Sequence, residues 1–250
     1  MRSLIILISL LIVGVASASL IINPYAFGVS SAPGTITAFW KLDEATGADN
    51  RVDSGGNAQD LDQVVSQTST NSVISLGASW GSGSGEYMVK TDSAALSCGD
   101  IDFTIAAWML KYDGNPRGAI NKGGLGSAAV IEYGLYTDGN SWKFAVSNGS
   151  TVTTVVSAAV SNGVWYYVVA WHDSTANTIN IQVNNGTPVS AAHTVGCQDS
   201  TGDFTVGRAA DGYQFNGALD EILFSKSILS DATKTYLYNA GAGRTCCPFP

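Results

Sequence analysis

The stretch GALDEILFSK, residues 217–226, combines a strand pattern with two adjacent carboxylates. Its apolar side chains fall on both faces of an extended chain, which predicts a buried β-strand. These apolar residues are Leu219, Ile222, Leu223 and Phe224. Asp220 and Glu221 stand in their midst, and we expect them on opposite faces because side chains alternate along a strand. The fold has to explain why so apolar a strand carries paired acids.

Similar strand patterns recur along the chain with turn signals between them. They span residues 36–42, 86–90, 102–110, 129–136, 142–147, 164–172, 178–184 and 203–208. Pairs such as Asp138-Gly139 and Asn185-Gly186 accept the positive φ angles of tight hairpins. The run TINIQVN, residues 178–184, alternates apolar and polar, which is typical of an antiparallel strand with one wet face. We predict an all-β fold in which two antiparallel sheets form a sandwich.

One short helix is predicted near the C-terminus. Ser230 can cap its first turn, Asp231 suits its positive end, and Gly241 can close it after Asn239. Leu237, with Tyr236 or Tyr238, is expected to dock the helix on the sheets.

The N-terminal residues predict export. Arg2 precedes an apolar run at residues 4–15, and Ala16-Ser17-Ala18 fits cleavage after Ala18, so residues 1–18 read as a signal peptide. Residues 4–22 carry no charge, which leaves a retained membrane anchor as the alternative. We expect an arm at 19–34, one domain at 35–245 and a tail at 246–250. The predicted localisation is secreted or cell surface.

The net charge narrows the classes of partner. The formal net charge of −8 argues against nucleic acid, because an acidic protein repels phosphates.

The four cysteines, Cys98, Cys197, Cys246 and Cys247, suggest two disulfides, and three connectivities stay open. Cys246 and Cys247 are expected to reach different partners. The spacing of the four cysteines does not fit a zinc site.

Four segments together resemble a laminin G-like domain of the concanavalin A-like lectin/glucanase superfamily. They are AFWKLDEATG…RVDSGGNAQDL, GSGEYMVKTDSAALSCGDIDFTIAAWM, GVWYYVVAWHDSTANTINIQVNNGT and FNGALDEILFSKSILSDATKTYLYNAG. The resemblance covers roughly residues 36–245 and implies a jelly-roll sandwich. Members of this superfamily mostly bind glycans or proteins outside cells, and they often carry calcium.

The resemblance implies a calcium site for the paired acids. In similar jelly rolls an Asp of the closing strand meets oxygens of the first loop, which here gives Asp220 with Asp53 and Asn57 of VDSGGN. Glu44 or Glu221 could add a ligand. The alternative is that both acids lie in water at a strand edge or pair with Lys226 or Arg208.

The sequence offers no clear catalytic constellation. Glycoside hydrolases of the superfamily place carboxylates near Glu-x-Asp-x-x-Glu on one strand, and no such run occurs here. Glu132 stands alone in its strand. The pair His172-Asp173 lies at a predicted hairpin tip, and the GSGSG stretch fails the G-x-S-x-G spacing. We therefore predict a protein that is not an enzyme.

Aromatic side chains are the other candidate site, because sugar rings stack on their faces. Residues 102–110 and 164–172 each carry two alternating sets, one for the core and one for an outer face. Tyr112, Trp142 and Tyr213 flank turns and are predicted to contact a ligand, with Tyr213 first because loops on a rigid sandwich usually carry binding.

These observations favour a secreted, non-catalytic binding module that recognises an extracellular glycan and is stabilised by calcium. An extracellular protein is the alternative partner. The alternative function is a structural subunit of a surface layer, filament or virion held together by protein contacts.

Overall fold

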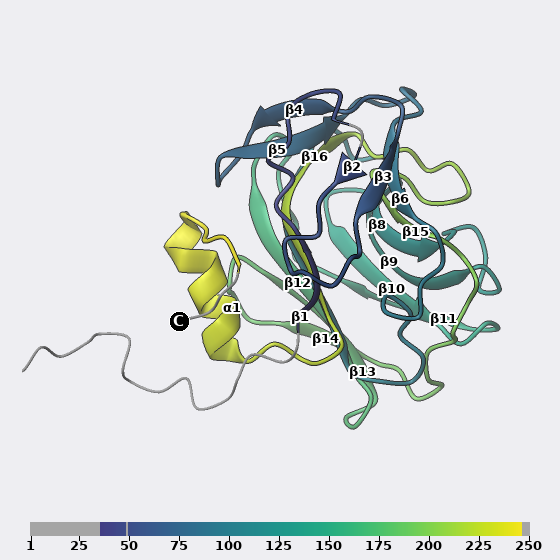
Figure 1. Ribbon diagram of the computed structural model, residues 1–250. Coiled ribbons are helices and arrows are strands. Elements are labelled where there is room, and N and C mark those ends of the chain that lie inside the picture. Colours follow the sequence, from purple (N-terminus) through teal and green to yellow (C-terminus); the bar gives the residue numbers. More distant parts are fainter. Residues whose placement is uncertain (1–35, 49, 247–250) are drawn as a thin grey trace, which may run out of the picture. The chain divides into compact units, whose positions relative to one another are not determined.

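The computed structural model describes residues 36–48 and 50–246, which form two antiparallel sheets (Figure 1). The predicted signal peptide, the N-terminal arm and Cys247 lie outside these residues. Sheet A is eight-stranded, with the order β14-β13-β12-β7-β16-β5-β4 and β1 paired to β16. Its strands are β1 (Ile36–Trp40), β4 (Thr68–Asn71), β5 (Leu76–Trp80), β7 (Phe103–Lys111), β12 (Tyr166–Asp173), β13 (Thr178–Val183), β14 (Val189–Ala192) and β16 (Gly217–Ser225). The predicted two-sheet sandwich is confirmed.

Sheet B is also eight-stranded, with the order β11-β10-β9-β8-β15-β6-β3-β2. Its strands are β2 (Asn50–Arg51), β3 (Leu61–Val64), β6 (Tyr87–Lys90), β8 (Arg117–Gly123), β9 (Ile131–Thr137), β10 (Trp142–Ser147), β11 (Val152–Val156) and β15 (Phe204–Val206). All nine strands that the sequence pattern predicts are present.

The main core lies between the sheets and follows the alternation of the strands. Phe103, Ile105, Ala107 and Met109 of β7 face inward together, as their shared parity predicts. They meet residues of sheet B such as Tyr133, whose ring centroid lies 5.1 Å from that of Phe103. The opposite face of β7 therefore points away from sheet B.

That outer face of sheet A is covered by helix α1 (Asp231–Tyr238), which Figure 1 shows packed beside it. Ser230 caps the helix, because its hydroxyl accepts a hydrogen bond from the Thr233 backbone nitrogen at 3.1 Å. The left-handed Asn239 ends the helix, and Gly241 closes the short 3₁₀ turn that follows, Asn239–Gly241. Leu237 packs against a second apolar cluster on this face. Its aromatic members are Phe39, Trp108, Trp165, Tyr167, Trp171, Tyr236 and Tyr238. The predicted docking of the helix is confirmed.

A β-bulge in β16 explains the paired acids. Leu219, Ile222 and Phe224 face the main core, whereas Asp220 lies opposite Trp108, a residue of the helix-covered face. Glu221 has a φ of 52° and is the extra residue of the bulge. Its side chain points to the same side, since it lines a small pocket with Trp108. The expectation that the two acids face opposite ways is therefore wrong.

Candidate functional site

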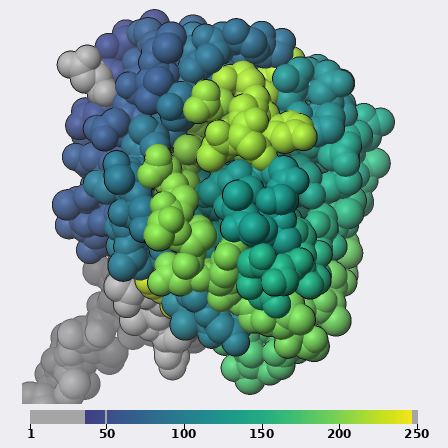
Figure 2. All heavy atoms as spheres, turned by 90° about the vertical axis from the view of Figure 1, so that its right-hand side faces the viewer, coloured from purple at the N-terminus to yellow at the C-terminus, as the bar shows by residue number. Residues whose placement is uncertain are grey.

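The outer face of sheet B is not covered by a helix in the described part of the chain (Figure 1). Figure 2 looks onto this side, where the yellow-green segment that leads into β16 lies beside teal segments from the middle of the chain. A hollow of about 150 Å³ opens here. It is lined by Pro116, Leu125, Ile131, Tyr136, Ala145, Val152 and Tyr213. An apolar hollow with two tyrosines on an uncovered sheet is a candidate binding site.

A row of short side chains crosses the outer face of sheet B, and its first member, Ala145, lines this hollow. The strand register places Ala145 of β10 opposite Gly134 of β9, Gly134 opposite Asn121 of β8, and Asn121 opposite Thr205 of β15. A Cβ atom at Gly134 would lie only 2.7 Å from Leu125 Cδ2 and 2.8 Å from Asn121 Oδ1. The absence of side-chain volume at Gly134 therefore makes room for the loop that carries Leu125.

Tyr213 stands beside this hollow on a well-anchored loop. Its backbone oxygen accepts hydrogen bonds from the backbone nitrogens of Gly118 at 3.1 Å and Ala209 at 3.2 Å. The carboxylate of Asp211 accepts a bond from the Leu125 nitrogen at 2.8 Å, which ties this loop to the loop after β8. The Tyr213 side chain itself is 43% exposed. A fixed backbone with an exposed ring is suited to stacking on a ligand.

A second hollow of about 490 Å³ lies near the first. Gly124 and Val130 line it, and their chain neighbours Leu125 and Ile131 line the first. Its walls are short, polar or glycine residues. They are Gly123, Gly124, Ala129, Val130, Gln198, Asp199, Ser200, Thr201, Gly202 and Ala210. The two hollows thus lie near each other on the loops of sheet B.

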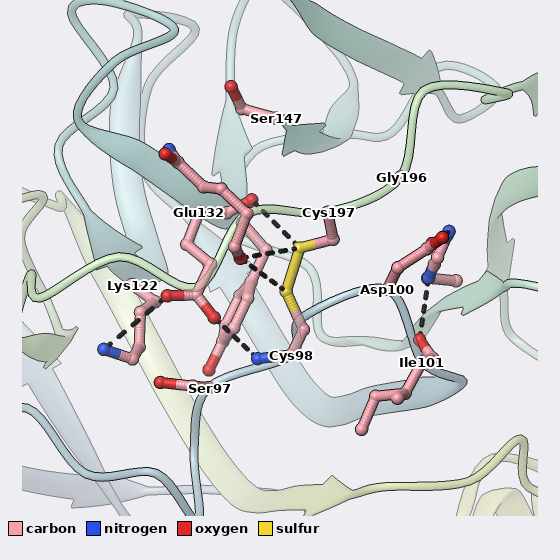
Figure 3. Close-up of a disulfide and its surroundings, with 12 residues drawn as sticks. Ser97, Cys98, Asp100, Ile101, Lys122, Glu132, Ser147, Gly196 and Cys197 are labelled. Atoms are coloured by element: carbon pink, nitrogen blue, oxygen red, sulfur yellow. Dashed lines mark hydrogen bonds and ion pairs between the residues drawn. A yellow bond between two sulfur atoms is a disulfide. The ribbon is translucent and has the colours of Figure 1, made fainter. Parts of the chain in front are cut away.

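The wall at residues 198–202 is held by a buried network around a disulfide (Figure 3). Cys98 bonds to Cys197, and the carboxylate of Glu132 accepts bonds from the Cys98 nitrogen at 2.6 Å and the Ser200 nitrogen at 3.0 Å. Lys122 Nζ lies 3.7 Å from the same carboxylate. Burial raises the pKa of Glu132, while these hydrogen bonds and Lys122 oppose the rise. Glu132, which stands alone in the sequence pattern, therefore has a structural role.

The cysteine pairing corrects one expectation. Cys98 and Cys197 are bonded to each other, so Cys246 and Cys247 cannot reach two different cysteines within this chain. Cys246 is itself disulfide-bonded. The grouping of Cys98, Cys197 and Glu132 is not a metal site, because both sulfur atoms are used in the disulfide.

The predicted calcium ligands Asp53 and Asn57 lie in one turn beside β1. Asp53 Oδ1 accepts hydrogen bonds from the backbone nitrogens of Phe39 at 2.9 Å and Gly55 at 2.8 Å. Asp53 Oδ2 accepts bonds from those of Asn57 at 3.0 Å and Gln59 at 3.1 Å. These four bonds use the lone pairs of the carboxylate, so a calcium ion at Asp53 would have to displace some of them.

Asp220, the third predicted calcium ligand, has different neighbours. Its Oδ2 accepts a hydrogen bond from the Ser72 hydroxyl at 2.5 Å, and the Ile74 backbone also bonds to this carboxylate. Burial raises the pKa of Asp220 to about 8, although the Ser72 bond lowers it. Glu221 accepts a bond from the Thr245 hydroxyl at 2.6 Å, and burial raises its pKa to about 7. The hydrogen bonds of Asp220 and Asp53 share no residue, and calcium at these residues stays a prediction.

Two other predicted ligand-binding aromatics lie elsewhere. Trp142 is 0% exposed in the main core, 6.4 Å from the ring of Phe215, so the expectation of a free loop aromatic is wrong. It is the first residue of β10, and its side chain points between the sheets. Tyr112 is 46% exposed but lines neither hollow. Sequence reasoning missed Tyr136, which the alternation of β9 places on the outer face of sheet B.

The fold and the uncovered site define a lectin-like β-sandwich. A laminin G family model, described as the concanavalin A-like lectin/glucanases superfamily, matches residues 81–233. The chain belongs to this superfamily. A comparison with curated proteins finds no match.

Solved structures share the fold at low sequence identity. The binding domain of Paraclostridial mosquitocidal protein 1 matches with a TM-score of 0.65 and 12% identity, over 83% of this chain and 52% of that chain. Trypanosoma rangeli sialidase in complex with sialic acid matches with a TM-score of 0.61 and 11% identity, over 86% of this chain and 35% of that chain. Domain 4 of an extracellular arabinanase from Geobacillus stearothermophilus, in complex with arabinotriose, matches with a TM-score of 0.58 and 13% identity. That match covers 85% of this chain and 100% of the arabinanase domain.

These matches establish the fold and are mostly to binding domains. The chain spans about half the length of the mosquitocidal protein's binding domain and about a third of the sialidase. Within the described residues, no helix combines the length and apolarity needed to cross a membrane.

Proposed function

We propose that this protein is a non-catalytic binding module that recognises an extracellular glycan on the outer face of sheet B. One observation carries the proposal: an exposed tyrosine, Tyr213, stands on an anchored loop beside an apolar hollow on the uncovered sheet. Tyr136 lines the same hollow. Aromatic rings flanking a shallow depression suit a sugar ring, because its C–H groups pack on their faces and its hydroxyls stay near water.

The comparisons support a binding role. The arabinanase domain is in complex with arabinotriose and the sialidase is in complex with sialic acid, while the mosquitocidal protein match is a binding domain. The sialidase is an enzyme, so hydrolysis is the outcome to exclude. No carboxylate lines the smaller hollow, and Asp199 alone lines the larger one. Two carboxylates at one site, which most glycoside hydrolases use, do not meet in these hollows.

The test compares two tyrosines of similar exposure. Tyr213→Ala and Tyr112→Ala are applied with the wild-type protein to an array of oligosaccharides, and hits are measured by titration calorimetry. We expect Tyr213→Ala to weaken binding about tenfold, since losing one stacked ring costs roughly 1–1.5 kcal/mol. Tyr112→Ala should bind as the wild type does.

Three results would contradict the proposal. The wild type could bind no glycan, Tyr112→Ala could lose binding while Tyr213→Ala keeps it, or the wild type could cleave the glycans that it binds. Self-assembly that depends on residues 1–34 would instead support the alternative role as a surface-layer, filament or virion subunit. We propose secretion or display at the cell surface as the setting in which either role operates.

A further inference from the structure

Behind Leu125, which lines the smaller hollow, lie buried polar groups that have no hydrogen-bond partner in the protein. Asn121 is 0% exposed, and neither its Oδ1 nor its Nδ2 makes a hydrogen bond. Within the described part of the chain, it is the only side chain with two buried polar atoms in this condition. Thr205, directly opposite Asn121 on β15, is 2% exposed, and its Oγ1 also lacks a partner.

Two glycines and one leucine define the space around the Asn121 amide. A Cβ atom at Gly118 would lie 2.8 Å from Asn121 Nδ2, and one at Gly134 would lie 2.8 Å from Asn121 Oδ1. The amide thus lies over two positions without side chains. Leu125 Cδ2 would be 2.7 Å from that same Gly134 Cβ, which places Leu125 beside the amide. Leu125 also lines the hollow, so its side chain stands between Asn121 and the open space.

This arrangement lowers the stability of the folded protein unless another group forms hydrogen bonds with the Asn121 amide. A buried amide or hydroxyl without a hydrogen bond costs roughly 1–3 kcal/mol. An apolar residue of similar shape at position 121 would remove that cost, so the fold does not require an asparagine there. The polar atoms are adjacent to the hollow that we assign to the glycan, and a ligand can supply the missing bonds.

We propose that Asn121 and Thr205 are the hydrogen-bonding floor of a subsite for a neutral sugar, reached when the Leu125 side chain turns aside. The proposal rests on the proposed glycan-binding function. An amide presents one donor and one acceptor side by side, which matches two neighbouring sugar hydroxyls. The smaller hollow is lined by no charged residue, Asp199 lines the larger one, and the net charge is −8. Acidic sugars are therefore disfavoured.

The test uses variants that keep the shape of the floor. Asn121→Leu and Thr205→Val replace polar atoms by apolar ones, and Tyr213→Ala serves as the variant of the stacking ring. Each is titrated with arabinotriose, cellotriose and maltotriose as neutral probes and with sialyllactose as an acidic one. We expect Asn121→Leu to bind the neutral probes about tenfold more weakly, from the loss of roughly 1–2 kcal/mol of hydrogen bonding. Its melting temperature should be equal to or higher than that of the wild type.

The outcomes separate this inference from the proposed function. If Tyr213→Ala loses binding and both floor variants keep it, the floor is not a subsite although the protein binds glycans. If the wild type binds none of the array, both proposals fall. Tighter binding of sialyllactose than of the neutral probes overturns the assignment to neutral sugars.

Nuclear magnetic resonance gives a readout that does not depend on how well the variants fold. The side-chain NH₂ signals of Asn121 should shift on addition of the best neutral probe to the wild-type protein. Unchanged signals at saturation would overturn the inference.

Discussion

The two outer faces of the sandwich both carry aromatic side chains, but these are buried on sheet A and at least partly exposed on sheet B. On sheet A, Trp108, Tyr167 and Trp171 are buried beneath α1 and form the second apolar cluster. On sheet B, Tyr136 and Tyr213 border an open hollow over small residues. Strand alternation turns an aromatic set outward on sheet A and Tyr136 outward on sheet B, where the loop residue Tyr213 joins it. The helix that covers sheet A leaves only the aromatic residues of sheet B free to bind.

The difference shows that aromatic content alone does not locate a binding face. The sequence suggests that the outward rings of residues 164–172 could line a concave face, yet the helix uses them as its docking surface. Sheet B has no comparable cover among the described residues, and the row of short residues across it joins Ala145 and Gly134 to Asn121 and Thr205. Mutations on sheet A should therefore change stability, and mutations on sheet B should change binding.

Trp108→Ala gives the largest effect expected of a single substitution. Its indole is 3% exposed and packs in a cluster with the rings of Tyr167 at 5.5 Å and Tyr238 at 6.0 Å, so truncation leaves a cavity under the helix. We expect the free energy of unfolding to fall by about 3–5 kcal/mol in urea denaturation. Tyr213→Ala, the matched variant on sheet B, should change it by less than about 0.5 kcal/mol. Equal losses in the two variants would break the distinction between the faces.

The buried acids of the helix-covered face predict an unusual dependence on pH. The pKa of Asp220 is raised to about 8 and that of Glu221 to about 7, with burial as the main cause. The folded state therefore holds protons that the unfolded state has released above about pH 4. Stability should be greatest near pH 4 and should decline as the pH rises towards 8, by up to about 1.4 kcal/mol per pH unit for each group.

Asp220→Asn provides the control for this pH dependence. The amide mimics the protonated acid, so the decline between pH 4 and 8 should become shallower in the variant. Chemical denaturation at several pH values measures the slope. A wild-type stability that rises across this interval would contradict the prediction, as would identical slopes in the two proteins.

Calcium is expected to have the smallest effect. Asp53 already accepts four backbone hydrogen bonds, so an ion would gain little there beyond the bonds that it displaces. Stabilisation by about 1 kcal/mol in millimolar calcium would raise the melting temperature by roughly 2–4 °C. Asp53→Asn and Asp220→Asn should each abolish that rise. A rise that persists in both variants would place the ion elsewhere, and no rise in the wild type would remove the calcium site.

The parts of the fold that follow from local patterns were predictable. Alternation in residues 102–110 separates the two faces of β7, although not which of them is inward, and Ser230 marks the start of α1. Strand β8 was missed because its sequence, RGAINKG, contains glycines and charges instead of an alternating apolar pattern. That strand supplies Asn121 to the candidate site. The sequence could not indicate this role, because it depends on pairing with β9 and β15.

Other errors arise where long-range packing overrides local signals. Trp142 follows a turn signal, but the register of β10 with β9 directs its ring inward. The pairing of Cys98 with Cys197 spans 99 residues and depends on the completed sandwich. Tyr213 was predictable as a loop aromatic, whereas its neighbour Tyr136 required knowledge of which sheet stays uncovered.

The bulge at Glu221 has a consequence for how this chain is compared with others. Between Asp220 and Leu223, β16 uses three steps where the facing segment of β7, Trp108 to Ala106, uses two. The residues on either side keep the in-and-out order of an uninterrupted strand, since Leu219 and Ile222 both face the core. Glu221 is thus a one-residue insertion, and the strand residues on both sides of it keep their alternation of inward and outward side chains. In an alignment with relatives that lack the bulge, the gap belongs at this residue, and Leu223 and Phe224 keep their counterparts.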